Sequence, residues 1–210
     1  MGVERVEDPS RVQGRALLGS RGNAPCVSLQ KGVSRMENLA PAGNWDALRS
    51  AVAAGADAVY LGYAAYSARA GAGNFDEQQL RDAVRFAHLH HVRVHVTVNT
   101  LIKDGELAGV VDVLRLLSEI RVDAVLVQDL GVLRMARRCF PDLPIHASTQ
   151  MTITGVNGAR LLKELGASRV VTARELSLDE IRRIRDEVDV EIESFVHGAL
   201  CYCYSGQCLM

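Results

Sequence analysis

From residue 37 onward, short apolar segments alternate with longer amphipathic segments. The short segments predict β-strands, and the longer ones carry apolar residues at helical spacing. Gly55 and Gly166 lie where a helix has to end shortly before the next strand, a position that favours glycine. The alternation predicts parallel βαβ units in an α/β domain. The predicted strands are 38–40, 58–61, 93–99, 124–128, 145–148, 169–172 and 190–196, and the predicted helices lie near 44–54, 76–90, 105–119, 131–138, 156–165 and 178–187.

The number of strands restricts the architecture further. A (β/α)8 barrel has eight strands and about 250 residues, whereas an open doubly wound sheet usually has fewer strands. This chain has 210 residues and seven predicted strands. We therefore expect an α/β fold, a TIM-like (β/α)8 barrel truncated after the seventh strand. Such a fold has its functional site at the C-terminal ends of the strands and an unpaired strand edge.

Residues 1–35 differ from the rest of the chain. They mix charges, glycines and two prolines, and their longest apolar stretch is 16–18. We expect neither a signal peptide nor a membrane helix here, but a disordered N-terminal extension that includes Cys26. The domain is then 36–210, incomplete at its C-terminus. Met36 stands directly before the first predicted strand, which suggests a translation start there.

The net charge and the cysteine content narrow the possible binding partners and the cellular location. The net charge of −1 predicts no strong global attraction to nucleic acid, so an RNA contact would depend on a local patch or on parts of the protein beyond this chain. Five cysteines without a secretory signal indicate reduced thiols and a cytoplasmic location.

Three of these cysteines form a cluster at the end of the chain. Cys201, Cys203 and Cys208 follow the last predicted strand and lie close to His197. Concentrated thiolates suit a soft metal or a redox pair better than core packing. The C-x6-C spacing is wider than the usual start of a structural zinc site, which favours an iron–sulfur cluster. A cluster usually has four thiolate ligands, so at least one ligand must lie elsewhere. A set of buried or incidentally paired thiols is the alternative.

The same stretch resembles a known family. The pattern Glu193-x-Phe195-x-x-Gly198-Ala199-Leu200-Cys201-x4-Gly206-x-Cys208-x-Met210 is similar to the signature of the peptidase U32 family, also called the collagenase-like protease family. The resemblance covers residues 36–210. It extends through the segments 39–44, 67–75, 98–105 and 148–151.

The resemblance implies a chemistry other than the family's name suggests. Family members include proteins for 5-hydroxyuridine formation in transfer RNA, for ribosomal RNA hydroxylation and for oxygen-independent ubiquinone hydroxylation. Several carry a [4Fe–4S] cluster on four cysteines. Cys201 and Cys208 match the first two of these cysteines, and the other two would lie beyond residue 210. Cys203 is an additional cysteine without an assigned role. The implied activity is oxygen-independent hydroxylation of RNA, with transfer RNA uridine as the first candidate substrate.

The predicted strand ends supply further candidate site residues. His197 and His146 are candidate proton carriers, and Arg69 or Arg174 is expected to bind an anion. The polar residues expected at one mouth with Cys201 are Asn99, Gln128, Asp129, His146, Ser148, Gln150, Arg174, Glu175 and His197, joined by Arg69 from the glycine-rich loop after the second strand. Within this set, Arg174 and Glu175 are further catalytic candidates. Asn99 and Gln150 are further substrate-binding candidates.

Several of these residues allow a structural explanation. His146 alternates within a strand and could belong to a satisfied barrel layer. Arg174 and Glu175 could be an ion pair that caps the next helix. The histidines at 88, 90 and 91 fit a solvated helix end, and Cys139 is expected at the opposite face of the barrel.

Two other functions remain open at this stage. The chain has neither a His-Glu-x-x-His zinc motif nor a Gly-x-Ser-x-Gly elbow, although Cys201 and His197 could form a thiolate–imidazole pair in a peptidase, that is, a hydrolase. Alternatively, the chain is a non-catalytic fragment or a partner subunit that depends on a C-terminal extension.

Overall fold

A computed structural model describes residues 36–68, 73–198 and 201–208. The predicted extension 1–35 and the candidate Arg69 lie outside these residues. All seven predicted strands and all six predicted helices are present, and two short 3-10 helices, η1 and η2, were not predicted. The elements are β1 (Leu39–Pro41), α1 (Trp45–Ala53), β2 (Ala58–Gly62), α2 (Glu77–Leu89), β3 (Arg93–Val98), η1 (Asp104–Glu106), α3 (Leu107–Glu119), β4 (Ala124–Val127), α4 (Leu130–Cys139), β5 (Ile145–Ala147), η2 (Thr149–Met151), α5 (Val156–Glu164), β6 (Arg169–Val171), α6 (Leu178–Glu187) and β7 (Glu191–Glu193).

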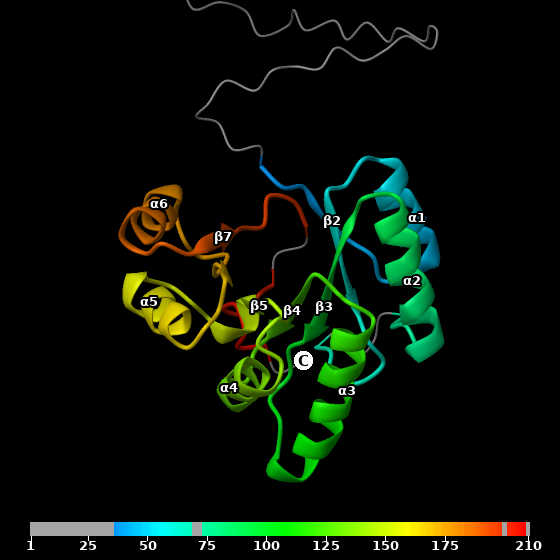
Figure 1. The fold of residues 1–210 in the computed structure, drawn as a ribbon. Coiled ribbons are helices and arrows are strands. Elements are labelled where there is room, and N and C mark those ends of the chain that lie inside the picture. The colour runs from blue at the N-terminus through cyan, green and yellow to red at the C-terminus, as the bar shows by residue number, and fades with distance from the viewer. Residues whose placement is uncertain (1–35, 69–72, 199–200, 209–210) are drawn as a thin grey trace, which may run out of the picture. The chain divides into compact units, whose positions relative to one another are not determined.

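The strands form one parallel sheet in sequence order, β1 to β7. The sheet curves, and the helices lie along its outer side (Figure 1). Within the described residues β1 and β7 do not pair with each other, so the sheet is a curled half-barrel rather than a closed barrel. The predicted α/β, TIM-like architecture is confirmed, with its seven parallel strands in the described residues.

The apolar core lies between the sheet and the helices. Val94, Val96 and Val98 of β3 belong to it, as do Ile145 and Ala147 of β5. The residues between them on the same strands point to the opposite face of the sheet, because side chains alternate along a strand. On β3 and β5 these are polar and buried, namely His95, Thr97 and His146. The concave face of the half-barrel therefore carries polar side chains.

Side-chain caps fix several of the helix starts. The carboxylate of Asp76 accepts a hydrogen bond from the amide of Gln79, and the side chain of Gln79 bonds back to the amide of Asp76. Ser177 and Glu180 form the same reciprocal arrangement at α6. Such caps satisfy amides that the first helical turn leaves free. Because Ser177 caps α6, Arg174 and Glu175 are available for other contacts.

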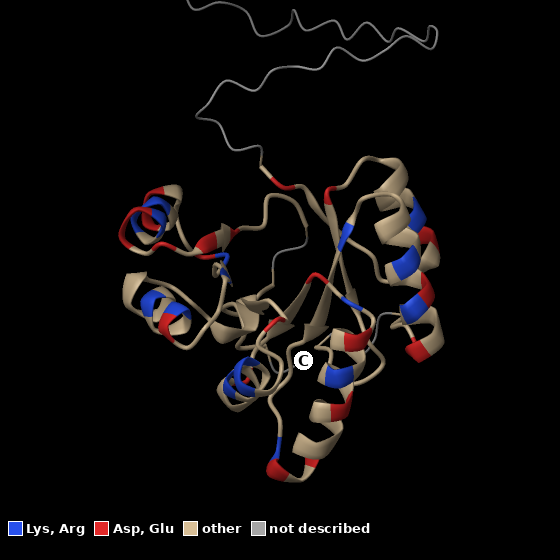
Figure 2. Ribbon diagram, viewed as in Figure 1, with Lys and Arg blue, Asp and Glu red and all other residues tan. Residues whose placement is uncertain are grey.

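The helix surfaces carry both signs of charge. Lys and Arg alternate with Asp and Glu along the outer helices, without a continuous basic stripe in this view (Figure 2). None of the helices in the described part of the chain is long and apolar enough to cross a bilayer.

Candidate metal and substrate site

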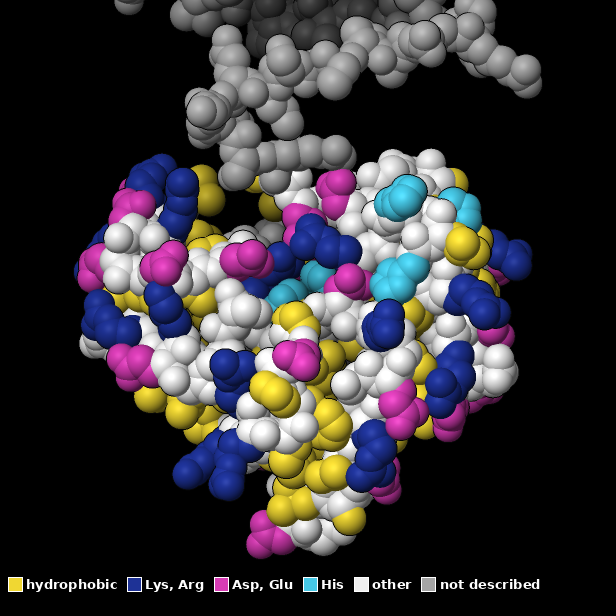
Figure 3. Space-filling model, viewed as in Figure 1, with side chains coloured by type: hydrophobic (Ala, Val, Ile, Leu, Met, Phe, Trp, Pro, Cys, Tyr) yellow, Lys and Arg dark blue, Asp and Glu magenta, His cyan; other side chains and the backbone are white. Residues whose placement is uncertain are grey.

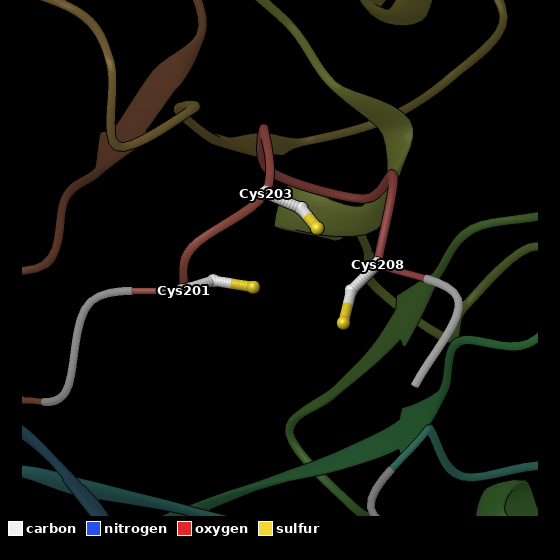
Figure 4. A group of neighbouring side chains, drawn as sticks. All are labelled: Cys201, Cys203 and Cys208. Carbon is white, nitrogen blue, oxygen red and sulfur yellow. The ribbon is translucent and has the colours of Figure 1, made fainter.

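The cysteine cluster lies on the segment after β7. Cys201, Cys203 and Cys208 each offer a sulfur, and the three sulfurs all lie within 4.8 Å of one another. Their side chains converge on one space (Figure 4). None of the three forms a disulfide within the described residues, and Cys201 and Cys208 are exposed whereas Cys203 is partly buried. Burial and the neighbouring thiols raise the pKa of Cys203, because each additional negative sulfur disfavours the next. A cation would relieve this repulsion, so the group suits a thiophilic metal.

Cys203 was left without a role by the sequence analysis. Its sulfur is nevertheless part of the converging group. No fourth ligand accompanies the three sulfurs among the residues that the structure describes. A centre with four ligands would need a further ligand from outside the described residues.

Polar contacts hold the cysteine segment against the ends of other strands. Ser205 is buried, and its amide donates a hydrogen bond of 2.8 Å to the carboxylate of Glu175. Its hydroxyl lies 3.3 Å from the same carboxylate and 3.1 Å from the amide of Arg174. The hydroxyl of Thr152 donates to the carbonyl of Ser205 at 2.6 Å. Glu175 and Thr152 follow β6 and η2, so two other segments of the chain position the cysteine segment.

The pKa of Glu175 reflects these contacts. Burial pushes this pKa upward, but hydrogen bonds from the amides of Glu175 and Ser205, from the Ser205 hydroxyl and the charge of Arg174 lower it overall. The carboxylate form is thus the one that fastens the segment. The guanidinium of Arg174 lies over the ring of Phe195 at 4.9 Å from its centroid.

Gly206 allows the segment to approach η2 closely. Its φ of +79° is in the left-handed region, and a Cβ there would lie 2.4 Å from the carbonyl oxygen of Gln150 and 2.6 Å from Oγ1 of Thr152. Only glycine fits both conditions without a shift of the backbone.

The predicted substrate-binding residues lie in the same hydrogen-bonded region. Asn99 donates to the hydroxyl of Ser148 at 3.2 Å and accepts from the amide of Ala68 at 3.0 Å. The amide of Gln150 also bonds to the Ser148 hydroxyl, at 3.3 Å. These residues follow β3 and β5, and Gln150 touches the cysteine segment through its carbonyl. Gln150, Arg174 and Glu175 thus lie next to the thiol segment, whereas Asn99 is linked to Gln150 through the Ser148 hydroxyl.

The two histidine candidates lie in different surroundings. His197 is exposed and stands four residues before Cys201. His146 is buried at the middle of β5, and its ring centroid lies 4.8 Å from that of His95 on β3. With Glu193 of β7, these two imidazoles form a second group whose ligand atoms lie within 4.8 Å of one another. His146 therefore belongs to a barrel-layer cluster and not to the thiol group.

The second group was not recognised from the sequence beyond His146. Arg169 lies among its carboxylates, at 2.8 Å from Glu37, 2.7 Å from Glu191 and 3.3 Å from Glu193. Histidine and charged side chains gather near the centre of the face shown in Figure 3. The available signal was the alternation of polar with apolar residues in Arg93–Val98 and Glu191–Glu193, which places His95 and Glu193 on the polar face of their strands.

Burial sets the charge state of the two imidazoles. It lowers the pKa of His95 to about 4 against the opposing effect of Glu37. It lowers the pKa of His146 to about 2, aided by His95 and Arg169. Burial conversely raises the pKa of Glu193, which Arg169 partly offsets. Both rings are neutral near pH 7.

His88, His90 and Cys139 lie outside both groups. His88 bonds to Asp123 at 2.8 Å, and Nδ1 of His90 lies 2.8 Å from the carbonyl of Phe86, so both complete the end of α2. Cys139 is exposed at the C-terminal end of α4, away from the C-terminal ends of the strands.

An α/β half-barrel with a thiol cluster after its last strand is the class of protein that the fold and site define. A family model described as Peptidase family U32 matches residues 43–210, and the chain belongs to that family. The resemblance inferred from the cysteine signature is confirmed.

Curated relatives of this family carry two kinds of name. The chain is 40% identical over 174 residues to the tRNA hydroxylation protein P1 of Bacillus subtilis, covering 83% of this chain and 41% of the relative. It is 42% identical over 174 residues to the 23S rRNA 5-hydroxycytidine C2501 synthase of Escherichia coli, covering 83% and 26%. It is 32% identical over 190 residues to a collagenase of Porphyromonas gingivalis, covering 85% and 45%. The chain spans less than half the length of these relatives.

A solved structure supports the fold. The U32 peptidase Mk0906 superimposes with a TM-score of 0.64 at 19% identity, covering 79% of this chain and 70% of that chain.

Proposed function

We propose that this chain is the barrel part of an iron–sulfur-dependent, cytoplasmic enzyme that hydroxylates a nucleobase of RNA without molecular oxygen, with transfer RNA uridine as the first candidate. The observation that carries the proposal is the convergence of the three cysteine sulfurs on the segment after β7. The names of the relatives from Bacillus subtilis and Escherichia coli support RNA as the substrate class.

The thiols fit a [4Fe–4S] cluster in their chemistry, and they would supply some of its four ligands. Cys201 and Cys208 are the proposed ligands from the family pattern, and Cys203 is close enough to be a third. Iron–sulfur clusters are held by cysteine thiolates, and further ligands would come from residues beyond 210. When bound, the cluster would supply electron transfer or polarise an oxygen donor.

The chain's own residues would hold the substrate beside this centre. Asn99 and Gln150 present amide groups that suit the edge of a nucleobase, and Arg69 or Arg174 would neutralise a phosphate. His197 is exposed before Cys201 and is the proposed proton carrier of the site. Glu175 acts here by positioning the thiol segment through Ser205. His146 belongs to the second group, with His95 and Glu193. A catalytic role for His146 would therefore require that this group is coupled to the thiol site.

Anaerobic purification with iron and sulfide analysis and an electron paramagnetic resonance spectrum tests the proposal. We expect about four irons on a chain extended past residue 210 and fewer on this chain. Cys201→Ser and Cys208→Ser should each lower the iron content of the extended chain, whereas Cys139→Ser, also an exposed thiol, should not. Absence of iron from both chains would overturn the cluster.

The substrate is tested separately in cells that lack their own transfer RNA hydroxylation protein. Expression of the extended chain should restore 5-hydroxyuridine, measured by nucleoside mass spectrometry, and expression of its Cys201→Ser variant should not. Restoration by the Cys201→Ser variant would contradict a role for the thiols in hydroxylation.

Peptidase activity is the second candidate, favoured by the collagenase relative. In that case Cys201 would be the nucleophile and His197 its base. Gelatin cleavage by metal-free protein, abolished by Cys201→Ala and retained in Cys208→Ala, would support it over the hydroxylase. A chain with neither activity, in both lengths, would be a non-catalytic partner subunit.

A further inference from the structure

The second polar group offers a chemistry that the thiol site does not use. His95, His146 and Glu193 belong to β3, β5 and β7, which are alternate strands of the sheet. In a barrel, alternate strands contribute the side chains of one interior layer. These residues therefore meet because of the sheet's curvature, although the first and last are almost a hundred positions apart in the sequence.

The group has polar atoms without partners. Nδ1 of His95 and Nδ1 of His146 are buried and make no hydrogen bond, and the same holds for Oε1 of Glu37. The two histidines are only 1% and 4% exposed. Buried polar atoms are nearly always satisfied, so several unsatisfied atoms in one cluster indicate a missing partner. An imidazole nitrogen with a free lone pair is a ligand for a metal ion.

The charges around the group favour a cation. Arg169 and Arg93 are the guanidinium groups here, and Glu37, Glu191 and Glu193 are the carboxylates. With neutral imidazoles, the carboxylates in these ion pairs exceed the guanidinium groups by one, and Asp123 adds a further negative charge that acts on His95. Arg169 makes its short contacts, 2.7 and 2.8 Å, to Glu191 and Glu37, and its contact to Glu193 is longer, at 3.3 Å. Glu193 is therefore the carboxylate least committed to arginine.

The dimensions are compatible with direct coordination. The three ligand atoms lie within 4.8 Å of one another. Bonds to a first-row metal are about 2.0–2.2 Å long, which puts neighbouring ligand atoms roughly 3–4 Å apart. A small side-chain adjustment would close the group around an ion. Two imidazoles and one carboxylate suit zinc or ferrous iron and leave coordination positions open.

We propose that His95, His146 and Glu193 bind a divalent transition-metal ion on the concave face of the half-barrel. The ion links β3 and β5 to β7, which has only three residues and pairs on one side alone within the described sheet. This site is separate from the thiol group, so its existence does not depend on the proposed hydroxylase function.

Cobalt binding tests this site without interference from the thiol cluster after β7. The parent protein for the test carries Cys201→Ser, Cys203→Ser and Cys208→Ser. After removal of loose metal, it should bind one Co²⁺ per chain with a visible spectrum of nitrogen and oxygen ligands and without thiolate-to-cobalt charge transfer. Absence of stoichiometric Co²⁺, or a sulfur signature, would overturn the proposal.

A matched pair of variants identifies the ligand. Glu193→Gln should weaken Co²⁺ binding at least about tenfold, since even changes next to a ligand cost this much. Glu191→Gln alters the same strand and another carboxylate partner of Arg169 but should leave the affinity within about threefold. Equal losses in both variants would refute direct ligation and indicate a general charge effect.

The histidines are tested by a measurement that needs no substitution. X-ray absorption at the zinc edge of the Zn²⁺-loaded triple-serine protein should show the multiple-scattering signal of two imidazoles. A spectrum with oxygen ligands alone would overturn the assignment. His146→Gln should lower the affinity for Co²⁺ as well. The circular dichroism spectrum of this variant must match that of the parent, so that the loss reflects the ligand and not unfolding.

Discussion

Replacement of Gly206 by alanine tests how the thiol segment is positioned. Gly206 has a φ of +79°, and an added Cβ would lie 2.4 Å from the carbonyl oxygen of Gln150. The obstacle is a backbone atom and not the end of a flexible side chain. The variant must therefore either move the segment away from η2 or distort both backbones.

The expected cost has two parts. An alanine in the left-handed region costs about 1–2 kcal/mol. Forced overlap in a packed site adds about 1–3 kcal/mol. The sum of roughly 2–5 kcal/mol destabilises the closed state, in which the segment is docked against η2. The open, undocked state is not destabilised, because there the segment is free to adopt another backbone conformation. Since about 1.4 kcal/mol changes an equilibrium constant tenfold, we expect the open state to gain at least about 30-fold.

Hydrogen exchange of the Ser205 amide reports this opening. That amide donates to the carboxylate of Glu175 at 2.8 Å and is adjacent to Gly206. Its exchange should accelerate by at least about 30-fold in Gly206→Ala. Affinity of the three thiols for Cd²⁺ should fall in the same variant.

Gly55→Ala is the matched control. Gly55 has a similar φ of +82°, but a Cβ there would have no atom within 4 Å. This change should lower the free energy of global unfolding by only about 1–2 kcal/mol, the cost of an alanine in the left-handed region. It should leave the exchange rate of the Ser205 amide unaltered. An exchange rate in Gly206→Ala within about threefold of the parent would refute the close approach as the reason for glycine.

Three further changes probe other parts of the molecule. Arg169→Met should lower the free energy of unfolding by up to about 3–5 kcal/mol in urea titrations at pH 7, because it removes a buried guanidinium that pairs with three carboxylates and leaves the partly buried Glu193 without its arginine partner. The half-exposed Arg93→Met should cost no more than about 1 kcal/mol, and equal losses would contradict the argument. Because the pKa of Glu175 is below its ordinary 4.5, the docking that it provides should persist above pH 4.5 and be lost as pH falls through the lowered pKa. The Ser205 amide shift should titrate with a midpoint under 4.5, and Glu175→Gln should abolish this transition; a midpoint at or above 4.5 would contradict the lowered pKa. Asp129→Ala removes the cap of α4 and should cost about 1 kcal/mol in thermal unfolding, so an unchanged melting temperature would exclude a capping contribution.

The strand prediction was least accurate at the end of the sheet. The alternation of apolar residues predicted a strand over 190–196, whereas β7 ends at Glu193. Its neighbour β6 ends at Val171, and the Thr172 amide makes the last backbone hydrogen bond between them, to the carbonyl of Glu193. Beyond Glu193, no strand in the described residues provides backbone hydrogen-bond partners that would extend β7. Phe195 and Val196 are accordingly 45% and 98% exposed despite their apolar character.

The candidate site was predictable where residues are close in sequence. The spacing of Cys201 and Cys208 indicated a thiol centre, and their sulfurs do converge. Strand ends indicated Asn99 and Gln150, since parallel strands bring their C-terminal ends to one edge. The contact of Glu175 with Ser205 was not predictable, because it joins residues 30 positions apart through a loop conformation.

The sequence by itself determined the α/β class, the order of the elements and the family, because these depend on local periodicity and on a short signature. Only the tertiary structure decided which distant polar residues meet. Arg169 reaches Glu37 across 132 positions, and His95 meets His146 and Glu193 inside the curved sheet. Period-two alternation tells which face a side chain occupies, but register and curvature of the sheet determine its neighbours on that face.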